Sequence, residues 1–183
     1  MFSLSGMGAE YLEETRPTKP LLPKAPELRA LVRAIALDIG ADIQPVQNLR
    51  VLREVMGFFD DKDTKTKHKL AWGKKWIENG FDGVEAKLAK SAGKYCVGDE
   101  LTIADAFLVP QVYNARRFKV SDGCVCACGG VPRIMALRKR ALTLRGSLQC
   151  DMSKYPTISR VTETLEALPE FKQAHPSEMP DAA

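Results

Sequence analysis

The chain has 183 residues, a length that fits one domain, and its hydrophobic content of 45% is enough to form a real core. No apolar run approaches the length that a membrane-spanning helix needs. The N-terminal residues lack the basic and apolar regions of a secretory signal, so we expect a cytoplasmic protein that does not bind membranes.

The net charge of +4 comes from one block of the chain, residues 121–150. This block holds a single acidic residue, Asp122, and five basic ones: Arg133, Arg138, Lys139, Arg140 and Arg145. When all six of these charged residues are left out, the totals of 27 basic and 23 acidic residues in the chain become equal. A nucleic-acid-binding surface would therefore depend on this block alone, and we expect no nucleic-acid partner.

The first half of the chain predicts helices separated by proline-rich sequence. Glu10 to Thr15 is typical of a short helix, and Pro17–Pro26 is a linker because proline favours extended backbone. The next helix should begin at Pro26 and should be kinked or interrupted by Pro45, continuing to about Met56. Its apolar face recurs every three or four residues: Leu28, Leu31, Val32, Ile35, Ile39 and Ile43.

The second half also predicts helices. Asp60–Lys69 is expected to be a solvated loop or helix start, and Ser91–Gly98 a turn. Between them lies an apolar stripe of helical spacing, with two tryptophans that we interpret as core packing: Leu70, Trp72, Trp76, Ile77, Phe81, Val84 and Leu88. Two further helices are expected from Thr102 to about Phe118 and from Pro156 to Leu168. No β-type alternation of useful length occurs, so the fold class is all-α.

Thr102 and Asp105 have the spacing of a helix-capping box. Thr102 can cap the first turn, and the Asp105 carboxylate can accept a hydrogen bond from the backbone N–H of Thr102. We assign Asp105 to folding rather than to catalysis. Cys96, just upstream, is interpreted as a small core residue.

The segment that carries this box, CVGDELTIADAFLVPQVYNARRF (residues 96–118), resembles the C-terminal helical domain of glutathione transferases. The similarity is to the zeta class, also called maleylacetoacetate isomerases, and three other segments share it: Glu10–Pro23, Gly40–Leu52 and Tyr155–Asp181. The resemblance implies a helical bundle over residues 26–183. It also implies that residues 1–25 are the end of the last helix of a thioredoxin-like domain followed by a linker.

In that family, glutathione adds to a conjugated double bond, the bond rotates, and the thiol leaves, which converts maleylacetoacetate to fumarylacetoacetate in phenylalanine and tyrosine breakdown. The thiol is activated by a Ser-Ser-Cys motif at a helix start. This sequence contains no such motif. We therefore name no catalytic residue and expect the chain alone to have low or no activity. Glutathione is the implied cosubstrate, with dicarboxylates or α-halo acids as substrates.

The resemblance implies that five residues line the wall of the glutathione and substrate pocket: Gln44, Asn48, Leu49, Arg50 and Arg117. Arg50 departs from the family, which often has serine there. For Gln44 and Asn48 the alternative is backbone capping around Pro45. Arg117 is suited to a substrate carboxylate, or else is a solvated cation at a helix C-terminus.

Residues 121–150 interrupt the family-like sequence, which becomes continuous when FKV is joined directly to DMSKYPTIS. The block contains Cys124, Cys126, Cys128 and Cys150, but the spacing is not that of a zinc site and no histidine lies near, so we expect no metal. We interpret the block as an irregular insertion, and as a retained in-frame intron or an error in the gene sequence.

Two alternatives to the enzyme remain open. The chain could be a non-catalytic helical interaction module, able to form a dimer with a full-length subunit. It could instead be a misassembled isoform with no stable product.

Overall fold

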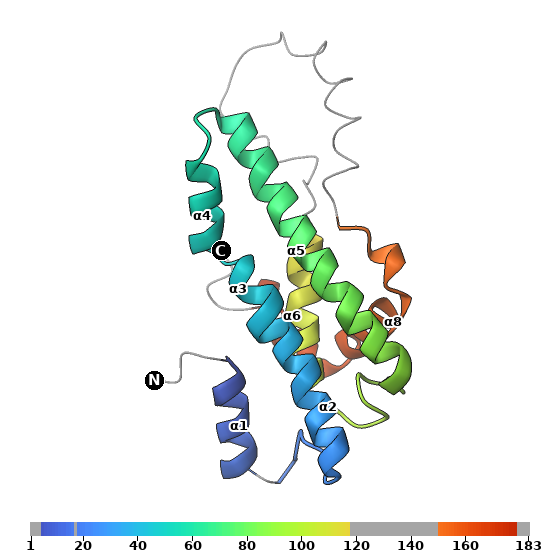
Figure 1. Ribbon diagram of the computed structural model, residues 1–183. Helices are drawn as coiled ribbons and strands as arrows, with labels where there is room; N and C mark the ends of the chain where they lie inside the picture. The colour runs from blue at the N-terminus through green and yellow to red at the C-terminus, as the bar shows by residue number, and fades with distance from the viewer. Residues whose placement is uncertain (1–4, 17, 118–149, 179–183) are drawn as a thin grey trace.

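The computed structural model describes residues 5–16, 18–117 and 150–178, and within these ranges every regular element is a helix (Figure 1). The all-α prediction is thus confirmed. The α-helices are α1 Ser5–Thr15, α2 Pro26–Leu37, α3 Gln44–Val46, α4 Leu49–Gly57, α5 Lys62–Ser91, α6 Ile103–Arg117, α8 Pro156–Glu166 and α9 Pro169–Gln173. A π-helix, η1, spans Asp38–Ile43, and two 3₁₀ turns are η2 Met152–Lys154 and η3 Pro176–Glu178. In the described part of the chain, no helix has both the length and the apolar character required to cross a membrane.

The long helix α5 packs against α4, η1 and α8, which lie along its length (Figure 1). Its buried stripe contains Ile77, Phe81, Val84 and Leu88, as the spacing predicts. The charged stretch before this stripe is a helix start: Asp61 is the N-cap, and its carboxylate accepts a hydrogen bond from the N–H of Thr64 at 2.8 Å.

The helix that begins at Pro26 widens before Pro45 and ends at Val46, just after it, before α4 begins at Leu49, so the predicted interruption is present. The wider turns of η1 fill residues 38–43, and α3 continues with Pro45 in its first turn. Proline lacks an N–H and clashes with the carbonyl four residues earlier, so the preceding turn must open. The widened segment still packs closely, since Ile39 and Ile43 are fully buried.

Two glycines allow η1 to lie close to its neighbours. A Cβ added to Gly80 of α5 would lie only 2.1 Å from Cγ1 of Ile43, and one added to Gly40 would lie 2.8 Å from the Phe107 ring. Neither position could hold a larger side chain without movement of its neighbour. One residue of the predicted apolar face is not buried: Leu28, in the first turn of α2, is 44% exposed.

At the start of α6, the Asp105 half of the predicted capping box is formed, with one more partner than the sequence predicts, whereas the Thr102 hydroxyl accepts no hydrogen bond from a described backbone N–H. One carboxylate oxygen of Asp105 accepts from the Thr102 N–H at 2.8 Å, and the other accepts from the N–H of Cys96 at 2.9 Å. The Thr102 hydroxyl donates to the same carboxylate at 2.9 Å, so it is held as a donor. Asp105 and Cys96 are completely buried, which places both in the core as expected.

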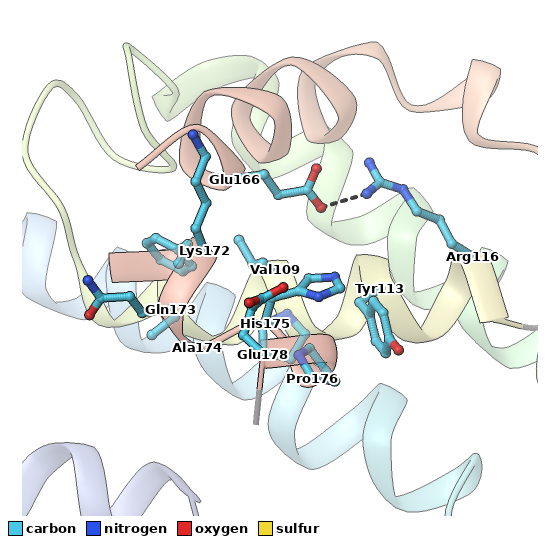
Figure 2. A pocket seen from close by; sticks show the side chains of 13 residues that line it. Val109, Tyr113, Arg116, Glu166, Lys172, Gln173, Ala174, His175, Pro176 and Glu178 are labelled. Carbon is cyan, nitrogen blue, oxygen red and sulfur yellow. Dashed lines mark hydrogen bonds and ion pairs between the residues drawn. The ribbon is translucent and has the colours of Figure 1, made fainter. Parts of the chain in front are cut away.

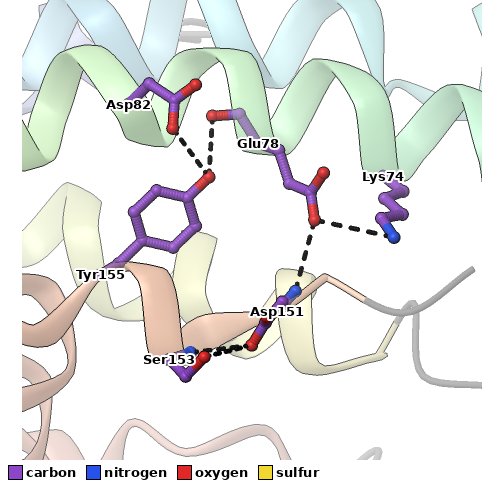
Figure 3. A network of polar contacts seen from close by, with 6 residues as sticks. All are labelled: Lys74, Glu78, Asp82, Asp151, Ser153 and Tyr155. Atoms are coloured by element: carbon purple, nitrogen blue, oxygen red, sulfur yellow. Dashed lines mark hydrogen bonds and ion pairs between the residues drawn. The ribbon is translucent and has the colours of Figure 1, made fainter. Parts of the chain in front are cut away.

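The segment that begins at Asp151 is fixed to α5 by polar contacts (Figure 3). The Tyr155 hydroxyl is within hydrogen-bond distance of the Glu78 carbonyl and of the Asp82 carboxylate, at 3.1 and 3.0 Å. The backbone N–H of Asp151 donates to the carboxylate of Glu78 at 3.3 Å. These contacts set the start of α8 against the middle of α5.

Helix α1 is longer than predicted: it begins at Ser5 rather than Glu10. It is tied to α2 by two hydrogen bonds from the Arg33 guanidinium to the Glu10 carboxylate, at 2.7 and 2.8 Å. The Glu13 carboxylate accepts from the N–H groups of Leu21 and Leu22, which fixes the proline-rich linker. These contacts hold the second half of α1 against α2 and the linker.

Candidate functional site

Three hollows follow one face of α6, and Pro110 lines all of them. Because proline has no N–H, the carbonyl of Ala106 loses its helical hydrogen bond and α6 is open at this point. The hollows are named here by their neighbours: the polar pocket beside α3, the C-terminal pocket beside α9, and the α1 pocket beside α1. Their shared residues make them parts of one surface.

The polar pocket has a volume of about 310 Å³, at the lower end of the range for small-molecule sites. Its lining is rich in side-chain amides and consists of Gln44, Gln47, Asn48, Pro110, Gln111, Tyr113 and Asn114. Two predicted site residues, Gln44 and Asn48, are thus brought together. Asn48 also caps α4, because its Oδ1 accepts from the Arg50 N–H at 3.0 Å.

A buried pair of amides forms the floor of the polar pocket. The Gln47 side chain donates to Oε1 of Gln111 at 2.6 Å, and the Gln111 side chain donates back at 3.4 Å. Gln111 is 1% exposed and Gln47 is 7% exposed. On the other side, the indole of Trp72 donates to the carbonyl of Val46 at 2.8 Å. The end of α3 is therefore fixed from both sides, which holds Gln44 and Asn48 in place.

The other predicted site residues do not join this group. Leu49 is 52% exposed at the start of α4, and neither it nor Arg50 lines any of the three hollows. Arg117 is the last residue of α6, and its side chain lies outside the described residues.

The C-terminal pocket is larger, about 1040 Å³, and is an open hollow between α6 and the segment of α9 and η3 (Figure 2). Its floor is apolar and includes Val109 and Phe171. At its edge, the Arg116 guanidinium donates to the Glu166 carboxylate at 2.5 Å, so this positive charge is already paired. The α1 pocket, about 680 Å³, is lined mostly by apolar residues of α1 and α6.

The two described cysteines are not nucleophiles at neutral pH. Burial is the main cause that raises the pKa of the Cys96 thiol, and the Asp105 carboxylate raises it further. Burial likewise raises the pKa of Cys150 to about 11. Since the thiolate is the reactive form, neither of these two described cysteines supplies a nucleophile at neutral pH.

In residues 5–16, 18–117 and 150–178, no three His, Cys, Asp or Glu side chains gather so as to hold a metal ion. The alternating cysteines Cys124, Cys126 and Cys128, and the insertion predicted around them, lie outside these described residues.

Sequence reasoning missed five residues of the polar pocket: Gln47, Pro110, Gln111, Tyr113 and Asn114. One of them had a usable signal. Gln111 falls in phase with Leu108, Val112 and Ala115, the buried stripe of α6. A polar side chain in such a stripe needs a buried partner, which marks it as unusual. The identity of that partner, Gln47, could not be read from spacing because the two are far apart in the chain.

Comparison with known proteins identifies relatives for this arrangement. The family model "Glutathione S-transferase, C-terminal domain" matches residues 51–146. A probable maleylacetoacetate isomerase of Vibrio cholerae is 40% identical over 173 residues, which cover 94% of this chain and 65% of the relative. The chain thus spans less than two thirds of the length of the curated relatives it matches.

Solved structures agree. A maleylpyruvate isomerase, described as a bacterial zeta-class glutathione S-transferase, has a TM-score of 0.73 at 36% identity; the match covers 95% of this chain and 68% of that one. The maleylacetoacetate isomerase of Anaeromyxobacter dehalogenans, with dicarboxyethyl glutathione and citrate in its active site, has a TM-score of 0.75 at 33% identity, covering 98% and 66%. Sequence and fold together show that the chain belongs to the glutathione S-transferase family, in its maleylacetoacetate isomerase or zeta-class branch.

Proposed function

We propose that this chain forms the helical wall of a glutathione-dependent cis–trans isomerase that acts on maleylacetoacetate or a related dicarboxylate. The observation that carries the proposal is the amide-lined polar pocket, which gathers Gln44 and Asn48 against α6. Glutathione is a peptide with amide groups and carboxylates, so side-chain amides suit it as hydrogen-bond partners. When bound, it supplies the thiol that adds reversibly to the conjugated double bond.

The residues of this chain contribute binding and orientation rather than thiol activation. Asn48 uses its Oδ1 to cap α4, and its Nδ2 is directed by that bond and remains available to a ligand. The Gln47–Gln111 pair fixes the backbone that carries Gln44 and Asn48. Arg117 is proposed as an anchor for a substrate carboxylate. Leu49 and Arg50 are proposed only as the outer edge of this wall.

Thiol activation has no source among the residues that line the polar pocket, which are neutral amides, a proline and a tyrosine. The sequence as printed has no Ser-Ser-Cys motif, and both described thiols are protonated at neutral pH. We therefore expect the chain alone to bind glutathione with a dissociation constant of roughly 1 mM or weaker and to show little or no turnover.

The test is a glutathione titration of the purified chain by NMR, with an isomerase assay on the same sample. Saturable shifts of residues around the polar pocket, without turnover, are the expected result. Substantial turnover would overturn the expected inactivity, and a folded sample that does not bind glutathione would overturn the proposed wall.

A matched pair of variants separates ligand binding from helix capping at Asn48. Asn48→Ser keeps a side chain that can cap α4 but shortens its reach into the pocket. Glutathione binding should fall in this variant while the stability stays close to that of the parent chain. Unchanged glutathione binding would assign Asn48 to capping alone.

A second candidate function, a helical interaction module, is favoured by the exposed apolar side chains of α1. Met7, Tyr11 and Leu12 are 59%, 48% and 55% exposed. Such a face favours association, either with a second copy or with a full-length zeta-class subunit. Sedimentation of the chain, alone and mixed with such a subunit, tests this reading; association that Leu12→Ser abolishes would support it.

The place of this chain in cytoplasmic phenylalanine and tyrosine breakdown, and its acceptance of α-halo acids, belong to the same proposal. So does the division into residues 1–25, a thioredoxin-domain end with its linker, and residues 26–183, the helical domain. Residues 121–150 are proposed to be a retained in-frame intron or an error in the gene sequence. Sequencing of the transcript tests this: a spliced product that lacks the block would confirm it, and a message that always contains the block would refute it.

A further inference from the structure

Tyr113 stands at the boundary between two of the hollows. It lines the polar pocket together with the amide side chains, and it also lines the C-terminal pocket. It lies one turn after Pro110, where the hydrogen bonding of α6 is interrupted. No other aromatic residue is shared by two of the three hollows in the described part of the chain.

The ring of Tyr113 is oriented from the C-terminal side. The imidazole of His175 packs edge-on against it, with ring centroids 5.3 Å apart and an angle of 87° between the planes. Nδ1 of His175 is in turn 2.7 Å from the Ser177 hydroxyl, which fixes the imidazole. In Figure 2 the Tyr113 hydroxyl points away from His175 and from the C-terminal segment.

The hydroxyl of Tyr113 has no hydrogen-bond partner within the residues that the structure describes. The side chains around it in the polar pocket are neutral: Gln44, Gln47, Asn48 and Asn114. No Asp or Glu of the described chain lines this pocket, whereas Glu166 and Glu178 line the C-terminal pocket. A free O–H donor among amide N–H donors, without a repelling carboxylate, is suited to an anionic oxygen.

We infer that Tyr113 is a specificity-determining residue that donates a hydrogen bond from its hydroxyl to a carboxylate oxygen of the substrate. This inference depends on the proposed function, because the substrate is the group carried on the sulfur of glutathione in the polar pocket. His175 is a positioning residue: it holds the phenol ring so that the hydroxyl faces the polar pocket.

The test compares two probes on the full chain by NMR titration. S-(1,2-dicarboxyethyl)glutathione carries carboxylates on the sulfur substituent, and S-methylglutathione carries none. Tyr113→Phe keeps the ring and its contact with His175 but removes the hydroxyl. We expect this variant to bind the dicarboxyethyl probe roughly tenfold more weakly and to bind the methyl probe as the parent does.

Other outcomes overturn the inference in distinguishable ways. Equal affinity of the parent and Tyr113→Phe for the dicarboxyethyl probe would mean that the hydroxyl does not contact the substrate. Equal weakening of both probes would mean a structural role. Failure of the parent chain to bind either probe would overturn the proposed function itself, and this inference with it.

A second variant tests the positioning role of His175. Because His175 is exposed and lies near the C-terminal end of the described chain, His175→Ala should leave the fold intact. It should weaken only the dicarboxyethyl probe, by a smaller factor than Tyr113→Phe. Unchanged binding of that probe would mean that His175 does not position the Tyr113 ring. His175→Phe should restore the ring contact and the affinity.

Discussion

Two polar side chains of α6, Asp105 and Tyr113, differ sharply in how many of their hydrogen bonds are satisfied within the fold. In the first turn of α6, the Asp105 carboxylate receives three hydrogen bonds and is completely buried. Around Pro110, by contrast, the Ala106 carbonyl has lost its helical partner, and the Tyr113 hydroxyl has none among the described residues. Satisfied buried groups stabilise a fold, whereas groups left with spare donors and acceptors are available to a ligand. One helix thus has an anchoring end and a binding face.

The largest expected effect comes from breaking the anchoring end. Asp105→Ala removes the acceptor of three buried donors, and we expect the free energy of unfolding to fall by about 3–5 kcal/mol. Urea denaturation followed by circular dichroism measures it. Glu163→Ala, at an exposed position of α8, is the control and should change stability by less than about 0.5 kcal/mol. A loss at Asp105 no larger than at Glu163 would contradict the anchor.

The next effect concerns the packing that carries α3 and the polar pocket. Gly80→Ala would place a Cβ 2.1 Å from Ile43, so it should destabilise the chain by about 1–3 kcal/mol through overpacking. Gly83, one turn along the same helix, has no neighbour within 4 Å of an added Cβ. Gly83→Ala should therefore stabilise the chain by about 0.5–1 kcal/mol, as alanine does in an open helix position.

The test is whether Gly80→Ala lowers the stability of the chain while Gly83→Ala raises it, because both variants make the same chemical change. The variant Gly80→Ala with Ile43→Val should recover part of the loss. If both alanine variants stabilise the chain equally, the close approach of η1 to α5 is not required, and α3 is positioned by other contacts.

The amide pair tests whether the binding face needs its own buried support. Gln111→Leu leaves the buried Gln47 amide without its partner and should cost about 1–3 kcal/mol. Replacing both residues with leucine removes the unsatisfied group, so the double variant should be more stable than Gln111→Leu alone. Thermal unfolding of the parent, Gln47→Leu, Gln111→Leu and the double variant measures the coupling between the two residues. Additive effects on stability would mean that the two amides do not interact.

The features that could be predicted from the sequence are those whose contacting residues lie close together in the chain. The pairing of Thr102 with Asp105 lies within one turn, so spacing alone predicts it. The exposure of the Leu28 side chain depends on which segments cover α2. The pairing of Gln47 with Gln111 depends on the packing of α3 against α6. Neither is local, and periodicity carries no information on them. The same limit applies to Tyr113, whose value as a site residue arises only where two hollows meet.

The smallest expected effect is at the surface, where α1 meets α2 beside the α1 pocket. The hydrogen bonds from Arg33 are the main cause that lowers the pKa of Glu10 below its ordinary value of 4.5. A lowered carboxyl pKa means that the pair stabilises the fold above that value and stops doing so as the pH falls through the folded-state pKa.

Glu10→Gln should therefore lower the free energy of unfolding by less than about 1 kcal/mol at pH 7, since both side chains are partly exposed. The variant should lose no stability relative to the parent once the carboxyl is protonated in acid. Urea midpoints of the parent and the variant at neutral and acid pH, with Glu163→Gln as the control, measure this. A loss that persists in acid would mean that Glu10 supports α1 through packing, and the polar contacts of α1 would then belong with the anchoring end of α6 rather than with a weakly held surface.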